Sequence, residues 1–387
     1  MDKERSLIFP KAEFVSRIHA LQNEMARQNC AALLLTSPAD VFYITGFLTR
    51  FWESPARPWF VVVPAKANPI AVIPAIGEQL MSQTWLDDIR CWDAPDPVDD
   101  GVSLLASVLR GTTKGGTVGV PMGLETSLRM PLADYTRLEE VTSLEFIDAT
   151  AVVQRVREIK SEAEIEKLSA VSAVAHRAFE QLPDIIAKAP YLDQIFRQFQ
   201  SALLGEGADW IAYTAGAAGQ GGYGDVIAPA THKALRPGDV VMLDTGAVRD
   251  GYFCDFDRNV SIGPPKVRTC QANAALHDAI DHVLTNLRPG MLACDVHAMF
   301  CSFLDGLGET PGTGRLGHGL GVTLTEWPSF TTKDTTTLRE GMVLTLEPSV
   351  IISPGQMLVH EENIVLRETG PELISTRAPR DMPQVSL

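Results

Sequence analysis

Residues 239–260 read Asp239-Val-Val-Met-Leu-Asp244-Thr-Gly-Ala-Val-Arg249-Asp250-Gly251-Tyr-Phe-Cys-Asp255-Phe-Asp257-Arg-Asn-Val260. Two apolar runs flank its centre. The Arg-Asp-Gly between them is typical of a hairpin turn, because Gly tolerates positive φ and Asp bonds its own backbone. We therefore predict two antiparallel strands joined by a tight turn.

Three carboxylates of this hairpin share one face. If the turn centres on Arg249-Asp250, Asp244 lies opposite Asp255; if it centres on Asp250-Gly251, Asp244 lies opposite Asp257. Either register places all three on one side, because side chains alternate along a strand. Carboxylates crowded on an apolar ribbon repel one another and are costly to desolvate. The pattern therefore predicts a positive group at this face, and a metal ion is the natural candidate.

Three later segments carry further side chains that bind metals. His318 lies between glycines in Gly-His-Gly-Leu-Gly, Glu347 lies in Leu-Glu-Pro, and Glu361 begins a β-rich run. The two glutamates, Asp244 and Asp255 carry a charge of about −4, which two divalent ions neutralise, and two-metal hydrolytic centres hold their ions roughly 3.5–4 Å apart. The charges predict a dinuclear centre.

The order of these residues resembles the pita-bread metallopeptidase family, which includes methionine aminopeptidase, aminopeptidase P and prolidase. That order is an Asp, a second Asp eleven positions on, Gly-His-Gly-Leu-Gly, Glu-Pro, and a Glu that opens an apolar strand. The resemblance covers roughly residues 155–370. The metal ligands that it implies are Asp244, Asp255, His318, Glu347 and Glu361.

The resemblance implies a hydrolase that cleaves a C–N bond of the amide or peptide type, nominally an Xaa-Pro dipeptidase or aminopeptidase. Two divalent ions are expected, and a set of carboxylates with one imidazole suits manganese, iron, cobalt or zinc. Glu347 and His318 are the expected catalytic residues, with Glu347 moving the proton while an activated water attacks the carbonyl. The expected substrate is a dipeptide or another small molecule.

At two positions the residue of this chain differs from the one found in the family members that handle proline. Those enzymes have a histidine seventeen residues before the first ligand Asp and another seven residues after the ligand His, where this chain has Ile227 and Thr325. His232 takes the place of one missing histidine only if the alignment of its loop with the family is shifted. The departures favour a non-peptidase that acts on a small polar metabolite, as creatinase, ectoine hydrolase and dimethylsulfoniopropionate lyase do. A catalytically silent binding protein on the same fold is the third alternative.

The composition is that of an ordinary globular protein. The chain has 387 residues, of which 45% are hydrophobic and 21% are charged, and its net charge of −15 argues against a nucleic-acid partner. The six cysteines show no Cys-x-x-Cys spacing, and we expect reduced thiols. We find neither a signal peptide nor an apolar run of about 20 residues that would span a membrane. A cytoplasmic enzyme is expected.

Periodicity predicts an α/β (α+β) fold with two domains. Residues 11–28 have helical spacing, and short apolar runs at 31–36, 43–47, 59–64 and 69–74 predict strands. This order resembles the amino-terminal α/β domain of creatinase and prolidase, which we place at residues 1–153. A capping box at Ser161 and Glu164 opens a helix of the pita-bread catalytic domain at residues 154–387, with further helices near 191–205, 268–287 and 293–307.

The segment from Arg50 to Trp59 concentrates arginines and aromatic residues in an expected loop. One interpretation is packing between domains. The other is substrate recognition, because in dimeric relatives the amino-terminal domain contributes to the partner's active site, which implies a homodimer. The predicted substrate-binding residues are Arg50, Trp52, Arg57, Trp59, Tyr213, Ile227 and Thr325.

Overall fold

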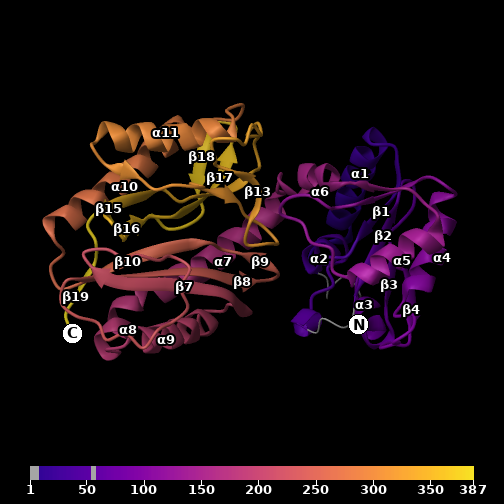
Figure 1. Ribbon diagram of the computed structural model, residues 1–387, viewed down its shortest axis with the longest axis horizontal. Coiled ribbons are helices and arrows are strands. Elements are labelled where there is room, and N and C mark those ends of the chain that lie inside the picture. Colours follow the sequence, from indigo (N-terminus) through magenta and orange to yellow (C-terminus); the bar gives the residue numbers. More distant parts are fainter. Residues whose placement is uncertain (1–7, 54–57) are drawn as a thin grey trace. The chain divides into compact units, whose positions relative to one another are not determined.

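The computed structural model describes residues 8–53 and 58–387. The chain divides between Arg157 and Glu158 into two compact units, which we call the amino-terminal and the carboxy-terminal unit. The division lies after Arg157 rather than after Val153, because helix α6 (Thr150–Arg157) continues through Val153 and Arg157 pairs with Asp40 of the same unit at 2.8 Å. Figure 1 shows that each unit has its own strands and its own covering helices.

A six-stranded sheet forms the amino-terminal unit, in the order β4-β3-β2-β1-β5-β6. The strands are β1 (Cys30–Leu35), β2 (Phe60–Pro64), β3 (Ile70–Pro74), β4 (Asp88–Trp92), β5 (Thr117–Val120) and β6 (Phe146–Asp148). Besides α6, the helices are α1 (Lys11–Arg27), α2 (Pro38–Thr45), α3 (Glu78–Met81), α4 (Val102–Thr113) and α5 (Leu132–Thr142). Strands β1 to β3 are continuous apolar runs because almost every side chain on both faces is buried.

The strand predicted over residues 43–47 is wrong, because this segment ends helix α2. Ser37 caps the helix, since its hydroxyl accepts a hydrogen bond from the Asp40 N–H at 3.1 Å, and Pro38 occupies the first turn. Gly46 ends it with a φ of +75°, a left-handed conformation that favours glycine. The capping residues at both ends favour a helix, although several residues between them have a high β-propensity.

The carboxy-terminal unit combines three sheets and five helices among the described residues. The helices are α7 (Glu162–Glu180), α8 (Leu182–Lys188), α9 (Leu192–Gly205), α10 (Val267–Asn286) and α11 (Ala293–Gly306). One sheet has the order β19-β10-β8-β7, with β9 paired to β8, and the others are β11-β15-β16 and β13-β12-β14-β17-β18. Their bounds are β7 (Trp210–Gln220), β8 (Asp239–Arg249), β9 (Tyr252–Phe253), β10 (Phe256–Ile262), β11 (Thr310–Pro311), β12 (His318–Gly319), β13 (Glu326–Ser329), β14 (Val343–Leu346), β15 (Ser349–Ser353), β16 (Gln356–Val359), β17 (Glu362–Arg367), β18 (Gly370–Leu373) and β19 (Gln384–Val385).

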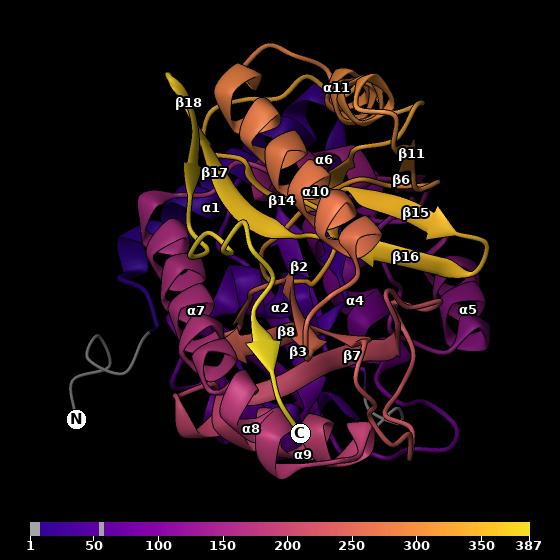
Figure 2. The same ribbon diagram turned by 90° about the vertical axis from the view of Figure 1, so that its left-hand side faces the viewer.

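Helices cover these sheets from two sides. One apolar core lies between α7 to α9 and the sheet of β8 and β10, and a second lies between α10, α11 and the other sheets. Figure 2 shows α7 to α9 on one side of the strands and α10 and α11 on the other. The capping box predicted at the start of α7 is confirmed, because Ser161 and Glu164 exchange side-chain to backbone hydrogen bonds. The strands enclosed between the helices carry Asp244 and His318, two of the implied metal ligands.

The hairpin formed by β8, β9 and β10 takes the second of the two registers that the sequence allowed. Asp250 and Gly251 form the turn with φ values of +53° and +79°, so both central residues have the positive φ of a type I′ turn. Asp257 consequently lies opposite Asp244. Asp255 lies two positions before Asp257, so the three carboxylates share one face of the ribbon.

Candidate metal centre

One cavity of about 390 Å³ in the carboxy-terminal unit is lined by all five metal ligands that the family resemblance implied. Asp244 lies on β8, Asp255 between β9 and β10, and His318 on β12, whereas Glu347 directly follows β14 and Glu361 directly precedes β17. Two sheets therefore contribute to the cavity, and their assembly brings together residues as far apart in the chain as Asp244 and Glu361.

The imidazole of His318 lies close to two of the carboxylates of the cavity. Its Nε2 lies 3.2 Å from Asp255 Oδ2 and 4.0 Å from Glu347 Oε1. Ligand atoms of Asp255, His318 and Glu361 all lie within 4.8 Å of one another, and all three residues are buried. An imidazole nitrogen and carboxylate oxygens at this separation are suited to bind a divalent metal ion.

Several carboxylate oxygens of the cavity are buried without a hydrogen-bond partner among the described residues. They are Asp244 Oδ1, Asp257 Oδ1 and Glu361 Oε1. Burial raises the pKa of Asp255 to about 8 against the opposing effect of Arg315, and burial followed by the charges of Asp255 and Asp244 raises the pKa of Glu361. Native proteins leave few buried polar atoms unpaired, and closely spaced acids repel. The residues therefore fit bound cations.

The backbone around His318 fixes the orientation of the ring. Nδ1 lies 2.8 Å from the carbonyl oxygen of Gly319, which assigns the proton to Nδ1 and leaves Nε2 as the nitrogen that faces Asp255. Glycine is required at position 317, where φ is +144° and a Cβ would lie 2.3 Å from the carbonyl oxygen of Thr345. The glycines beside His318 thus allow the strands to approach closely enough to present the imidazole.

Arg315 is a residue of the cavity that the sequence analysis did not identify. Among the described residues that line the cavity, it is the only lysine or arginine. Its Nε lies 3.2 Å from Glu347 Oε1, and its side chain is 35% exposed. It lies three positions before His318, in the same glycine-flanked segment, and this proximity is the signal that would have identified it.

Three of the predicted substrate-binding residues, Tyr213, Ile227 and Thr325, line the same cavity. Burial, followed by the charge of Asp244, raises the pKa of Tyr213, so its hydroxyl stays protonated beside that carboxylate. Ile227 is 75% exposed and lies at the mouth. Thr325 precedes Glu326, whose carboxylate pairs with Lys160 at 3.0 Å, and both charged side chains are 1% exposed. This buried ion pair anchors the segment that carries Thr325.

The other predicted substrate-binding residues belong to the amino-terminal unit. Arg50 and Trp52 lie in the 3₁₀ turn η2 (Arg50–Glu53), whereas Arg57 lies outside the described residues. Trp52 and Trp59 pack edge to face with a centroid separation of 5.7 Å, and Trp59 is only 2% exposed. The contacts observed for the two tryptophans are therefore packing within their own unit.

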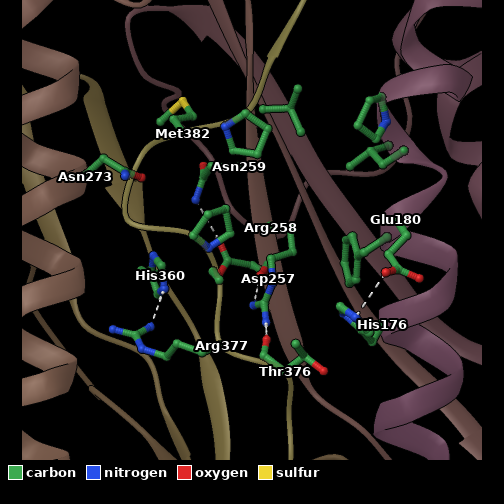
Figure 3. Close-up of a pocket in the computed structure, with 17 residues that line it drawn as sticks. His176, Glu180, Asp257, Arg258, Asn259, Asn273, His360, Thr376, Arg377 and Met382 are labelled. Atoms are coloured by element: carbon green, nitrogen blue, oxygen red, sulfur yellow. Dashed lines mark hydrogen bonds and ion pairs between the residues drawn. The ribbon is translucent and has the colours of Figure 1, made fainter.

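Two further histidines, His232 and His360, lie outside the lining of this cavity. His232 is exposed, stacks on Tyr191 at 4.1 Å and lies 3.4 Å from Asp193, so it does not replace a missing cavity histidine. His360 is buried and lines a second cavity, where its Nε2 accepts a hydrogen bond from Arg377 at 2.9 Å (Figure 3). Burial lowers the pKa of His360, so the ring is a neutral structural group on the opposite strand face.

Comparisons with known proteins match both units of the chain. Residues 166–368 match the model of metallopeptidase family M24, and residues 17–159 match the creatinase/prolidase amino-terminal domain. A probable dipeptidase PepE of Mycobacterium tuberculosis is 27% identical over 364 residues, with 92% of this chain and 93% of that protein covered. An Xaa-Pro dipeptidase of Lactobacillus helveticus is 26% identical over 346 residues, covering 87% and 89%.

Solved structures agree with these matches. The crystal structure of dipeptidase PepE from Mycobacterium ulcerans superposes with a TM-score of 0.84 at 25% identity, covering 98% of this chain and 100% of that one. Within the part of the chain that the structure describes, no helix combines the length and the apolar character needed to cross a membrane. The fold is thus the pita-bread fold preceded by a creatinase-like domain, and the chain belongs to metallopeptidase family M24.

Proposed function

We propose that this protein hydrolyses Xaa-Pro dipeptides with two divalent metal ions bound in the cavity of the carboxy-terminal unit. The observation that carries the proposal is the meeting of Asp255, His318 and Glu361 within 4.8 Å, next to buried carboxylate oxygens that have no partner among the described residues. Relatives named dipeptidase and Xaa-Pro dipeptidase support the substrate class.

The residues that would hold the two ions are Asp244, Asp255, His318, Glu347 and Glu361. Bound there, divalent ions would supply Lewis-acid polarisation of the scissile carbonyl and lower the pKa of water. The donor set contains far more carboxylate oxygen than imidazole nitrogen, and oxygen-rich sets suit manganese. Manganese is therefore the ion that we propose.

Side chains of the cavity would perform the remaining steps. Glu347 Oε1 lies 4.0 Å from His318 Nε2 and 3.2 Å from Arg315 Nε. We assign the proton transfer to this carboxylate, which would accept a proton from the attacking water and return it to the leaving nitrogen. Arg315 offers a guanidinium for the carboxylate of the substrate. A cation beside the cleaved bond favours dipeptides over longer peptides. In a dipeptide the free carboxylate belongs to the residue directly after the scissile bond, whereas in a longer peptide it lies further away.

The test is turnover by the metal-loaded protein. Purified protein is dialysed against chelator, reloaded with manganese, and assayed with Gly-Pro, Ala-Pro and the longer peptide Ala-Pro-Ala. We expect hydrolysis of the dipeptides that disappears on chelation and returns with metal. A protein that binds no metal and loses no activity on chelation would contradict the proposal.

A second candidate function is hydrolysis of a small polar metabolite that is not a peptide. The supporting observation is that Ile227 and Thr325 line the cavity. The family resemblance implies a histidine at each of these positions in the enzymes that handle proline. An aliphatic side chain and a hydroxyl cannot carry the charge that an imidazolium carries. The same metal-loaded protein should therefore be assayed with cyclic and N-methylated amides, and turnover of these without turnover of Xaa-Pro dipeptides would favour this candidate.

A homodimer in the cytoplasm is also part of our proposal. It is motivated by the family resemblance, in which the amino-terminal domain of one subunit approaches the active site of the other. Light scattering coupled to size-exclusion chromatography measures the mass directly, and we expect about twice the 42.1 kDa of one chain. A strictly monomeric active enzyme would exclude any shared site that involves Arg50, Trp52 or Arg57.

A further inference from the structure

Asp257 lies in the wall between two cavities of the carboxy-terminal unit. It lines the cavity of about 390 Å³ that holds the implied metal ligands, and it also lines a second cavity of about 240 Å³. Figure 3 shows Asp257 from the second cavity, with Asn259 and Arg258 beside it on β10. Asp257 is 2% exposed, and the five-ligand set that the family resemblance implies does not include it.

The two oxygens of Asp257 have different surroundings. Oδ2 accepts a hydrogen bond from Asn259 Nδ2 at 3.1 Å, and Asn259 is itself fixed because Nδ2 also donates to the carbonyl oxygen of Val359 at 2.7 Å. Oδ1 is buried and has no hydrogen-bond partner among the described residues. One oxygen is thus used to orient the carboxylate, and the other is left for a group that the protein itself does not provide.

The neighbouring arginine does not fill this position. Arg258 donates from Nη1 to the carbonyl oxygens of Asp257 and Glu361, and from Nη2 to Glu362 Oε2 and the carbonyl oxygen of Thr376. All four N–H groups of the two terminal nitrogens are therefore engaged elsewhere. Burial and the charge of Asp244 raise the pKa of Asp257 more than the charge of Arg258 lowers it, so a further positive partner would stabilise this buried carboxylate.

The unpartnered oxygen of Asp257 has two counterparts in the metal cavity. Asp244 Oδ1 and Glu361 Oε1 are buried without a partner in the same way, and both residues belong to the implied ligand set. Asp257 lies opposite Asp244 in the β8–β10 pair, where cross-strand Cβ atoms are only about 4.5–5.5 Å apart. The three oxygens thus have the same local chemistry and lie around the same cavity.

We propose that Asp257 is a sixth protein ligand of the metal centre and that Asn259 is its positioning residue. The inference rests on the proposed metal-dependent function. With Asp257, the centre has five carboxylates of charge about −5, which two divalent ions reduce to about −1, and the nearby Arg315 offsets the remainder. Each additional carboxylate oxygen also moves the donor set further toward hard ions such as manganese.

The test measures metal affinity rather than activity. Wild type, Asp257→Asn and Asn259→Ser are stripped of metal, and manganese binding is followed by calorimetry, with metal content by elemental analysis. Asp257→Asn should weaken binding of one ion at least about 10-fold, and Asn259→Ser about 10-fold, because loss of a partner that orients a ligand costs about 10–100-fold. Asp239→Asn is the matched control, since Asp239 is a buried aspartate of β8 whose two oxygens accept hydrogen bonds from Arg236 and Gln220.

The melting temperature separates a ligand from a merely structural residue. Replacing Asp257 by Asn removes a repulsive charge opposite Asp244, so the metal-free variant should melt no lower than metal-free wild type, whereas its rise in melting temperature on adding manganese should be smaller. A lower melting temperature without metal, together with an unchanged rise, would show a structural role. If Asp257→Asn does not fold, manganese binding by Asn259→Ser decides, and wild-type affinity there overturns the proposal.

The outcomes also separate this inference from the proposed function. If wild type binds two ions and Asp257→Asn binds both with unchanged affinity, Asp257 is not a ligand although the metallohydrolase stands. Unchanged affinity with a raised KM would assign Asp257 to the substrate instead and would likewise overturn the inference. If wild type itself binds no metal, both fail together.

Discussion

Asp257 of β10 and Asp244 of β8 face each other directly across an antiparallel pair, and each has one buried carboxylate oxygen without a partner among the described residues. The turn at Asp250-Gly251 sets this pairing, because moving the turn by one residue would bring Asp255 opposite Asp244 instead. Two carboxylates at such close range are stable together only with cations or protons between them. The hairpin register thus brings together two acids that need a positive partner.

Removing Asp255 should lower metal content and activity together. Asp255→Asn keeps the shape of the side chain but removes a charged oxygen that lies 3.2 Å from His318 Nε2. Since loss of a residue that only orients a ligand already costs about 10–100-fold in metal affinity or activity, loss of Asp255 should cost at least as much. Elemental analysis and kcat/KM are measured on the same preparation, and full turnover by metal-free protein would refute the assignment.

Replacing Arg315 should raise KM for substrates with a free carboxylate. Arg315→Gln removes the only lysine or arginine among the described residues that line the cavity, and loss of one charged hydrogen bond of about 1.5–3 kcal/mol corresponds to about 10- to 100-fold. The control substrate is the same Xaa-Pro dipeptide with an amide in place of its carboxylate, for which Arg315→Gln and wild type should differ little. Equal losses on both substrates would mean that Arg315 acts through Glu347 rather than on the carboxylate.

The second candidate function predicts that the residues at positions 227 and 325 limit Xaa-Pro turnover. If Ile227 and Thr325 mark a changed reaction, metal-loaded wild type should hydrolyse Xaa-Pro dipeptides poorly, and Thr325→His alone or with Ile227→His should raise kcat/KM. The reason is that an imidazole at the cavity surface can donate a proton or hydrogen bond to the charge that develops in the transition state. A wild-type kcat/KM of about 10⁴ M⁻¹s⁻¹ or more on Ala-Pro would contradict this expectation.

Trp52 should contribute to stability more than to substrate binding. Its ring lies 5.6 Å from that of Phe47 and 5.7 Å from that of Trp59, so Trp52→Ala leaves a gap in an aromatic cluster of the amino-terminal unit. We expect a loss of about 2–4 kcal/mol in the free energy of unfolding, with nearly normal kinetics in the folded protein. An unchanged melting temperature with a KM raised about 10-fold or more would instead support the substrate role predicted from the sequence.

Glu362 should make the protein sensitive to acid. Burial alone would raise the pKa of this carboxyl, but Arg258, His360 and Ser375 hold it well below its usual range. Because its folded pKa lies below the unfolded value of about 4.3, its contribution to stability is complete above that pH and is lost as the pH falls through the folded pKa. Wild type should therefore lose stability steeply below about pH 5.

The variant Glu362→Gln tests this dependence. Denaturation by urea at several pH values should give a shallower acid limb, and at neutral pH the variant should be less stable by about 3–5 kcal/mol, because Arg258 and Arg377 lose their buried partner. Glu372→Gln is the control, since Glu372 is 59% exposed and pairs with Arg367 on the surface. An acid limb of Glu362→Gln as steep as that of wild type would assign the acid sensitivity to other carboxylates.

Local patterns in the sequence determined those features that depend on neighbouring residues. The capping box at Ser161 follows from side-chain oxygens that reach backbone N–H groups three positions away, and the hairpin follows from a turn between two apolar runs. The order of Asp, Asp, His, Glu and Glu identified the family, because a metal centre demands these residue types whatever the intervening chain. Helix α2 was the exception, since its N-cap Ser37 lies outside the segment whose apolar residues suggested a strand and Gly46 within that segment is its C-cap.

Which side chains meet depends on how distant segments pack. Periodicity places Asp257 on the same strand face as Asp255, but only the register shows that it faces Asp244 and only the packed sheets show that one of its oxygens has no partner. Arg315 is an ordinary loop residue in the sequence and becomes the cation of the cavity because β12 and β14 bring it to Glu347. The physical reason is that burial and pairing arise between segments distant in the chain, and no local pattern encodes them.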